Sequence, residues 1–338
     1  MMRLLSVSDA DIAEAAEALK AGLLVAFPTE TVYGLGADGF NPAALARVFA
    51  AKNRPRFDPL IIHIAQVEGL EAAADLALLS GKARQQTRIL CGSLWPGPLT
   101  LILPKQREVP DLATSGLPTV AVRLPDHPAA RKLISLSTGA VAAPSANPFG
   151  FLSPTTAEHV RDQLGEKVDL IIDGGRTRVG VESTVLDMTG PRPRILRPGG
   201  VPREQIEALI GPVALPAAHE AGPVNAPGQL KSHYAPRTPL SLHSPPEMAA
   251  LTGEAGAGYL FFRGESRDRW LAGKGETGPS PRIRSLSGEG DTAEAAAALF
   301  ETLHELDRLG LSRIHAEEAP LVGLGPAIND RLRRAAAL

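Results

Sequence analysis

Arginine, lysine, serine and threonine side chains are concentrated in short polar strings within the first 200 residues. The strings are Pro28–Gly36, Lys52–Leu60, Ser93–Thr100, Thr119–Pro125, Ala143–Asn147 and Gly180–Val185. Residues 45–57 carry four basic side chains and no acidic one, and residues 172–203 carry six arginines. Guanidinium and ammonium groups bind carboxylate and phosphate oxygens, and hydroxyl groups add hydrogen bonds to the same oxygens. The strings therefore predict a site for small anions.

Other common site chemistries find no support in the sequence. Gly34–Gly39 matches the GxGxxG pattern, but six residues separate Phe27 from its first glycine, whereas a dinucleotide fingerprint begins directly at the end of a strand. The segment around Lys82 lacks the remaining residues of a phosphate-binding Walker loop. Cys91 is the single cysteine, which excludes an internal disulfide and a cysteine-built zinc site.

The elements that must position these strings alternate between strands and helices, which is typical of an α/β fold. Short apolar runs predict strands at 23–27, 60–64, 99–103, 119–124, 140–143, 168–173, 183–188 and 194–197. Capping residues and helical spacing predict helices at 8–21, 41–51, within 67–92, and at 127–136, 155–164 and 203–210. Residues 28–40 are interpreted as a polar loop. The polar strings then fall at strand ends, where α/β folds place their ligands.

Length and composition predict two domains. The chain has 338 residues, and a Pro-, Gly- and Ala-rich stretch divides it into a first domain at 1–210, a linker at 211–238 and a small α/β domain at 239–338. In the small domain, Gly258–Phe262 is predicted to be a strand, residues 291–309 a helix, and residues 273–290 one surface loop.

Charge and hydropathy narrow the class of protein further. Hydrophobic residues make up 44% and charged residues 21%, as in ordinary globular proteins, and the net charge of −2 argues against a long nucleic-acid track. No apolar run approaches the ~20 residues of a membrane-spanning helix, and no signal-peptide pattern is present. We expect a cytoplasmic protein.

The order and spacing of the six strings resemble the YrdC-like family, and Ser232–Pro236 together with Gly325–Ala336 is similar to the two-domain branch of that family. The resemblance implies a twisted, open, mixed sheet with flanking helices, followed by a smaller Rossmann-like α/β domain. It also implies an L-threonylcarbamoyladenylate synthase, a nucleotidyltransferase that uses L-threonine, bicarbonate and ATP with Mg²⁺. A separate transferase complex would then pass the threonylcarbamoyl group to tRNA.

The resemblance implies the following site residues. Lys52 and Arg54 would be catalytic and contact the triphosphate. L-Threonine would be bound by Thr31, His63, Arg123, Ala143 and Ser183. ATP would be bound by Arg54, Asp58, Thr119, Ser145, Asn147, Ser153, Arg197 and Tyr234. Asp58 departs from the family, which usually has Asn at this position. A carboxylate repels phosphates unless it binds Mg²⁺ or is turned away, so the role of Asp58 stays open. Tyr234 would belong to a lid over the nucleotide.

Two alternative functions remain open at this point. The basic clusters also suit an RNA-binding, translation-associated module that has the cleft but not the catalytic activity. They are also compatible with an enzyme that binds RNA weakly in addition to its catalysis. Multidomain relatives instead transfer a carbamoyl group from carbamoyl phosphate, but the additional kinase-like domain that accompanies this activity is missing from the sequence.

Overall fold

The computed structural model describes residues 2–215, 233–274 and 280–337. They form two compact units, each described by itself below. The first comprises residues 1–149, 154–178 and 182–229, and the second comprises 150–153, 179–181 and 230–338. Within the described ranges, no helix combines the length and apolarity that crossing a membrane requires. Residues 216–232 of the predicted linker, including Ser232, lie outside the described residues.

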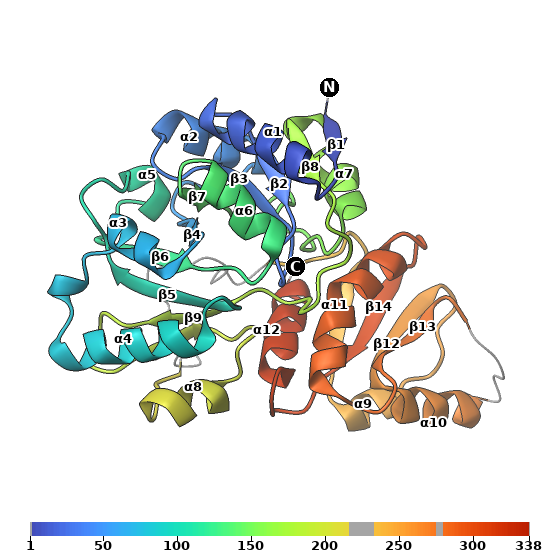
Figure 1. Ribbon diagram of the computed structural model, residues 1–338. Helices are drawn as coiled ribbons and strands as arrows, with labels where there is room; N and C mark the ends of the chain where they lie inside the picture. Colours follow the sequence, from blue (N-terminus) through green and yellow to red (C-terminus); the bar gives the residue numbers. More distant parts are fainter. Residues whose placement is uncertain (1, 216–232, 275–279, 338) are drawn as a thin grey trace. The chain divides into compact units, whose positions relative to one another are not determined.

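The first unit is built on a mixed sheet of ten strands in the order β1-β8-β2-β3-β7-β4-β6-β5-β9-β10 (Figure 1). The strands are β1 (Arg3–Leu5), β2 (Val25–Phe27), β3 (Gly34–Asp38), β4 (Ile61–Ile64), β5 (Leu99–Pro104), β6 (Thr119–Arg123), β7 (Ala140–Ala142), β8 (Leu170–Ile172), β9 (Thr184–Asp187) and β10 (Arg194–Arg197). β4 and β6 run parallel, whereas β7 and β5 run antiparallel to them on either side. The predicted mixed α/β sheet is confirmed.

The helices of the first unit begin and end with local signals. They are α1 (Asp9–Lys20), α2 (Pro42–Lys52), α3 (Leu70–Ala73), α4 (Gly81–Leu94), α5 (Asp111–Thr114), α6 (Pro128–Leu136), α7 (Ala157–Leu164) and α8 (Arg203–Ile210), with short 3₁₀ turns at Val67–Gly69, Leu76–Leu78 and Gly165–Lys167. The side chain of Asn41 caps α2 by accepting from the amides of Ala43 and Ala44, and Asn53 ends the helix in the left-handed conformation. Lys52 is thereby fixed at the last turn of α2.

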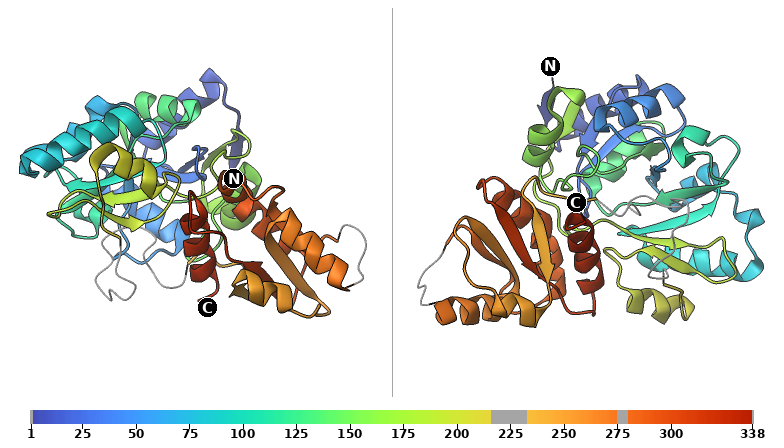
Figure 2. Two further views of the ribbon diagram at one scale, coloured as in Figure 1. Left: turned by 90° about the horizontal axis from the view of Figure 1, so that it is seen from below. Right: turned by 180° about the vertical axis from the view of Figure 1, so that it is seen from behind.

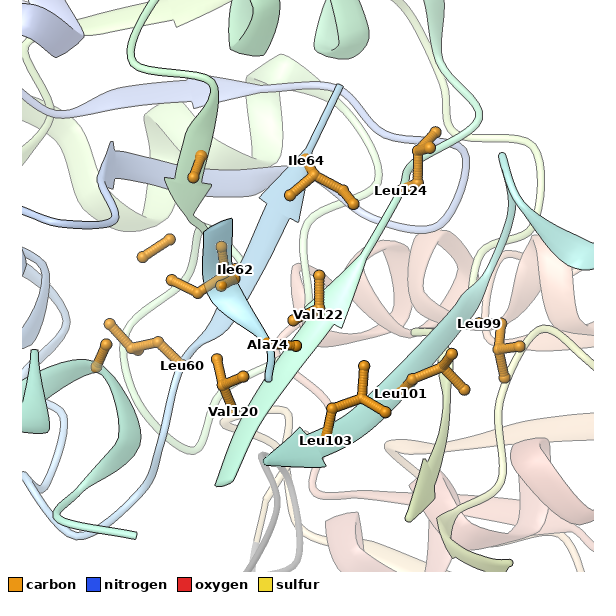
Figure 3. Packing of buried hydrophobic residues seen from close by; sticks show 14 of the residues in the cluster. Leu60, Ile62, Ile64, Ala74, Leu99, Leu101, Leu103, Val120, Val122 and Leu124 are labelled. Carbon is orange, nitrogen blue, oxygen red and sulfur yellow. The ribbon is translucent and has the colours of Figure 1, made fainter. Parts of the chain in front are cut away.

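The central strands of this sheet present two different faces. Alternate residues of β4, β6 and β5, including Ile62, Val122 and Leu101, point into the largest apolar core (Figure 3). Since side chains alternate along a strand, the residues between them lie on the opposite face. There Ile61, Ala121 and Ile102 form a small apolar cluster, followed by His63 and Arg123. The apolar core therefore determines which face carries the predicted site.

Two segments of the first unit differ from the predictions. Residues 34–38, which were predicted to be part of a loop, form β3 between β2 and β7, and residues 3–5 form β1. A Cβ atom on Gly36 would lie 2.8 Å from the Phe27 ring and 3.1 Å from the Val25 carbonyl oxygen. The glycines that make this segment look like a loop are therefore required by the close packing of a strand.

The second unit contains a parallel sheet of four strands in the order β11-β14-β12-β13. Its elements are β11 (Leu240–His243), α9 (Pro245–Ala250), β12 (Ala257–Arg263), α10 (Gly264–Lys274), β13 (Ile283–Ser287), α11 (Thr292–Asp307), β14 (Arg313–Glu317) and α12 (Gly325–Ala335). Tyr259 and Phe261 of β12 pack with Met248 of α9 and Trp270 of α10, and α11 and α12 pack against each other (Figure 2).

The smaller Rossmann-like α/β fold predicted for this unit is confirmed, but one of its segments was misread. Residues 283–287, inside the predicted loop 273–290, form β13 beside β12. The Gly-, Ser- and Pro-rich flanks conceal a strand that contains only two large apolar residues, Ile283 and Leu286.

Candidate active site

Three residues of the central strands line up across one face of the first sheet. His63 of β4 pairs with Arg123 of β6, and Arg123 pairs with Thr100 of β5. Residues that pair directly across a sheet point to the same side, so an imidazole, a guanidinium and a hydroxyl group lie in one row. All three residues are buried. The sheet therefore brings together two of the predicted L-threonine residues, His63 and Arg123.

Arg123 forms a buried ion pair with Glu30, which lies in the loop between β2 and β3. Arg123 Nη2 is 2.6 Å from Glu30 Oε1, and the two side chains are 5% and 1% exposed. Arg123 Nε also donates a long hydrogen bond of 3.4 Å to the Gly97 carbonyl oxygen. The guanidinium group predicted to bind a carboxylate is thus already next to one.

His63 is an uncharged hydrogen-bonding group in this row. Burial lowers its pKa to about 3, and the neighbouring Arg123 charge acts in the same direction. Its Nδ1 lies 3.2 Å from the Ile61 carbonyl oxygen, and its ring meets Phe27 edge-on. Backbone groups of Ile61 and Val141 both hydrogen-bond to this ring, so the chain itself holds the neutral imidazole in place.

Two loops bring Thr31 and Ala143 to the same region of the sheet. Thr29 Oγ1 accepts hydrogen bonds from the amides of Thr31 and Val32 and lies 2.8 Å from Thr31 Oγ1. This turn holds Thr31 fully buried. The amide of Ala143, directly after β7, donates to the Ile61 carbonyl oxygen. Ala143 thus lies beside the first residue of β4, and Thr31 directly follows Glu30, which contacts Arg123 of β6.

Ser183 connects the row to the second basic cluster. Its Oγ lies 2.7 Å from Thr100 Oγ1. Arg197 Nη2 donates to the Ser183 carbonyl oxygen at 2.9 Å and to its Oγ at 3.2 Å. A residue predicted to contact L-threonine and one predicted to contact ATP are therefore in direct contact.

Lys52 holds the loop that contains Ser145 and Asn147. Its Nζ donates hydrogen bonds to the carbonyl oxygens of both residues, and the Lys52 carbonyl oxygen accepts from the amide of Phe149. Burial lowers the pKa of Lys52 well below its ordinary value, and the positive charge of Arg54 adds to this. The lysine string and the serine string, 93 residues apart in sequence, thus form one structure.

Arg54 and Asp58 form a second buried ion pair. Arg54 Nη2 lies 2.8 Å from Asp58 Oδ2, and the guanidinium also donates to the carbonyl oxygens of Asp58 and Pro59. Burial raises the pKa of Asp58, against the positive charges of Arg54, Lys52 and Arg197. The departure from the family noted for Asp58 therefore places a carboxylate on Arg54.

The roles of the remaining three predicted residues, Thr119, Ser153 and Tyr234, stay predictions. Thr119 is at the start of β6, four residues and about 13 Å of strand from Arg123. Ser153 and Tyr234 belong to the second unit. There Tyr234 is buried, with φ of 64°, its ring 5.8 Å from Phe300 and 5.1 Å from the Arg331 guanidinium carbon. The amide of Ala235 donates to the Gly150 carbonyl oxygen. The lid remains a prediction.

Two residues of this site were not predicted from the sequence. Glu30 and Thr100 both lie inside polar strings, yet neither was assigned a role. For Thr100 a signal was available, because it lies between the apolar Leu99 and Leu101 in a strand otherwise composed of apolar residues. For Glu30 the sequence carries no comparable sign, since its partner is 93 residues away.

Comparisons with known proteins identify the family to which the chain belongs. A family model described as telomere recombination matches residues 17–199, and one described as the C-terminal domain of threonylcarbamoyl-AMP synthase matches residues 201–337. Threonylcarbamoyl-AMP synthases of Pyrococcus abyssi and Bacillus subtilis are 44% and 41% identical to the chain, covering 95% and 98% of it and 92% and 94% of their own lengths.

A solved structure has the same fold over nearly the whole chain. It is the crystal structure of P. abyssi Sua5 complexed with L-threonine, with a TM-score of 0.87 and 40% identity, covering 99% of this chain and 97% of that one. The resemblance inferred from the polar strings is confirmed: the chain belongs to the two-domain threonylcarbamoyl-AMP synthases of the YrdC-like family.

Proposed function

We propose that the chain is a nucleotidyltransferase that makes threonylcarbamoyl-AMP and pyrophosphate from L-threonine, bicarbonate and ATP. The amine of threonine and bicarbonate give a carbamate and water. A carbamate oxygen then attacks the α-phosphorus of ATP, and pyrophosphate leaves. The product would pass to a separate transferase complex that modifies tRNA.

The observation that carries this proposal is the chain of contacts from Arg123 to Arg197. Thr100, beside Arg123, contacts Ser183, and Ser183 accepts hydrogen bonds from Arg197. A guanidinium for the carboxylate of an amino acid and a guanidinium for phosphate are thus joined by two hydroxyl groups. Such an arrangement suits a reaction that joins two anionic reactants, for which positioning and charge neutralisation are the main requirements.

The choice of L-threonine as substrate is supported by the P. abyssi relative, whose crystal structure is a complex with this amino acid, and we place it at the Arg123 row. His63, Thr31, Ala143 and Ser183 would surround it. A neutral His63 can accept or donate a hydrogen bond without adding charge beside Arg123.

ATP would bind on the side of Lys52 and Arg197, as Mg·ATP. Mg²⁺ on ATP phosphates commonly keeps several water ligands and needs few protein carboxylates. Asp58 and Glu182 are acidic side chains that act on Lys52, and the pairing of Asp58 with Arg54 reduces the repulsion that phosphates would otherwise meet. Lys52 would act by holding the Ser145–Asn147 loop and by neutralising phosphate charge.

The proposal is tested by measuring pyrophosphate release from the purified protein with Mg·ATP and bicarbonate. We expect release that requires L-threonine, with L-serine as the specificity control and carbamoyl phosphate as a second control. Salt-sensitive RNA binding without threonine-dependent release would contradict the proposal and favour the RNA-binding alternative.

A further inference from the structure

The Arg123–Glu30 pair is incomplete in its hydrogen bonding. Three atoms of this pair have no hydrogen-bond partner within residues 2–215, 233–274 and 280–337: both carboxylate oxygens of Glu30 and Nη2 of Arg123. The two charged groups nevertheless lie 2.6 Å apart. The groups are close enough to attract each other but are not aligned for a hydrogen bond. Buried polar atoms are normally hydrogen-bonded, so these three atoms are suited to bind a polar ligand.

The chemistry of the three atoms defines what that ligand offers. Nη2 of Arg123 requires an acceptor, and the Glu30 oxygens require donors. An ion of a single sign suits one of the two groups and is repelled by the other. An α-amino acid at neutral pH carries a carboxylate and an ammonium group one carbon apart, so it offers both kinds of partner with no net charge.

The groups that pair with Arg123 across the sheet are uncharged, and the Arg197 guanidinium lies one residue further away, beyond Ser183. His63, paired with Arg123 across the sheet, is neutral because burial lowers its pKa to about 3. Thr100 and Ser183 contribute hydroxyl groups. The row thus has one positive and one negative charge, which matches a zwitterion.

We propose that Glu30 binds the amino group of the substrate, so that the Arg123–Glu30 pair recognises the zwitterion of an α-amino acid. This inference rests on the proposed function, because it places L-threonine at Arg123. It assigns Glu30 a direct contact with the atom that becomes the carbamate nitrogen. Glu30 thereby selects against acids that carry another group in place of the amine.

The test compares the binding of two ligands by calorimetry in the absence of ATP. The ligands are L-threonine and 2,3-dihydroxybutanoate of matching configuration, in which a hydroxyl group replaces the amine. The wild-type protein is expected to prefer L-threonine. Glu30→Gln should weaken L-threonine binding about 10- to 100-fold, the scale of one lost charge-assisted hydrogen bond, and leave binding of the hydroxy acid within about threefold.

Two further variants sharpen the result. Glu30→Asp keeps the charge and should retain the preference for the amine with weaker binding. Glu158→Gln makes the same chemical change at an exposed residue of α7, paired with Arg161 at 3.5 Å, and should change neither affinity. Binding of Mg·ATP by each variant shows that it is folded.

The outcomes separate this inference from the proposed function. If Glu30→Gln weakens both ligands equally, Glu30 only holds Arg123 in place, and the inference is wrong. A wild-type protein that binds both ligands equally well overturns it without any variant. Wild-type protein that binds no L-threonine overturns the proposed function and this inference together.

Discussion

The two buried arginine–carboxylate pairs of the first unit are alike on the carboxylate side and differ on the guanidinium side. Among the described residues, the oxygens of Asp58, like those of Glu30, have no aligned hydrogen-bond donor. Arg54 pairs with Asp58 at 2.8 Å and also donates to two carbonyl oxygens and lies over the Phe149 ring. Among the described residues, Arg123 pairs with Glu30 at 2.6 Å and makes one further hydrogen bond, of 3.4 Å, to the Gly97 carbonyl oxygen. The chain therefore holds the Arg54 guanidinium more fully than that of Arg123, and the substrate contacts of both arginines remain predictions. Burial and charge alone do not separate a structural arginine from a binding one, but the use of each N–H group does.

The strongest test of this difference is Arg123→Lys. An ammonium group cannot form the two parallel hydrogen bonds that a guanidinium gives to a carboxylate. We expect the KM for L-threonine to rise by the equivalent of about 2–4 kcal/mol, with the KM for ATP little changed. Steady-state kinetics of pyrophosphate release measure both constants.

A change confined to the KM for ATP would show that Arg123 is assigned to the wrong substrate. Conversely, equal changes in both constants would indicate that the variant disturbs the whole site. Urea unfolding of the same protein distinguishes the second case from a loss of folded protein.

The matching change at the other pair, Arg54→Lys, should act mainly on stability. It removes the guanidinium donors from the carbonyl oxygens of Asp58 and Pro59 and weakens the ion pair with the Asp58 carboxylate. Buried acceptors that lose their donors destabilise a protein by about 1–3 kcal/mol each. We expect the free energy of unfolding to fall by about that amount, as measured by urea denaturation, and by less in Arg123→Lys. If Arg123→Lys proved the less stable of the two, the comparison between the pairs would be reversed.

A smaller effect is expected from His63, which lies beside Arg123 and is uncharged. Its pKa of about 3 in the folded protein is below the ordinary value of 6.5. Between these values the unfolded chain binds more protons than the folded one, so stability decreases as the pH falls from about 6.5 toward 3. One such group contributes a slope of at most about 1.4 kcal/mol per pH unit.

Urea unfolding of the wild-type protein and of His63→Gln from pH 7 to pH 4 measures this slope. The glutamine does not titrate, so the variant should lose less stability over the same interval. Identical slopes for the two proteins would mean that His63 is charged, or accessible to protons, in the folded state.

Residue patterns predicted most of the first unit, because its central strands are apolar runs separated by clear helix caps. They failed at β3, where neighbouring atoms leave no room for a side chain at a glycine. They also failed at β13, a strand with only two large apolar residues among serines. The polar strings similarly indicated an anion site, and the sheet register explains why His63 and Arg123 meet. Glu30 was not predicted, because its importance comes from a partner on a distant strand. Single-residue patterns carry no information about such a pairing.

The alternation along β4 and β6 has a consequence for folding. If β6 shifted by one residue against β4, Arg123 would turn toward the apolar side that now holds Val122, Ile62 and Leu101. An unpaired guanidinium among these side chains costs several kcal/mol, so the shifted alignment is strongly disfavoured. The arginine proposed to bind substrate thus also guides the strands to their correct partners while the sheet assembles, before any substrate is present.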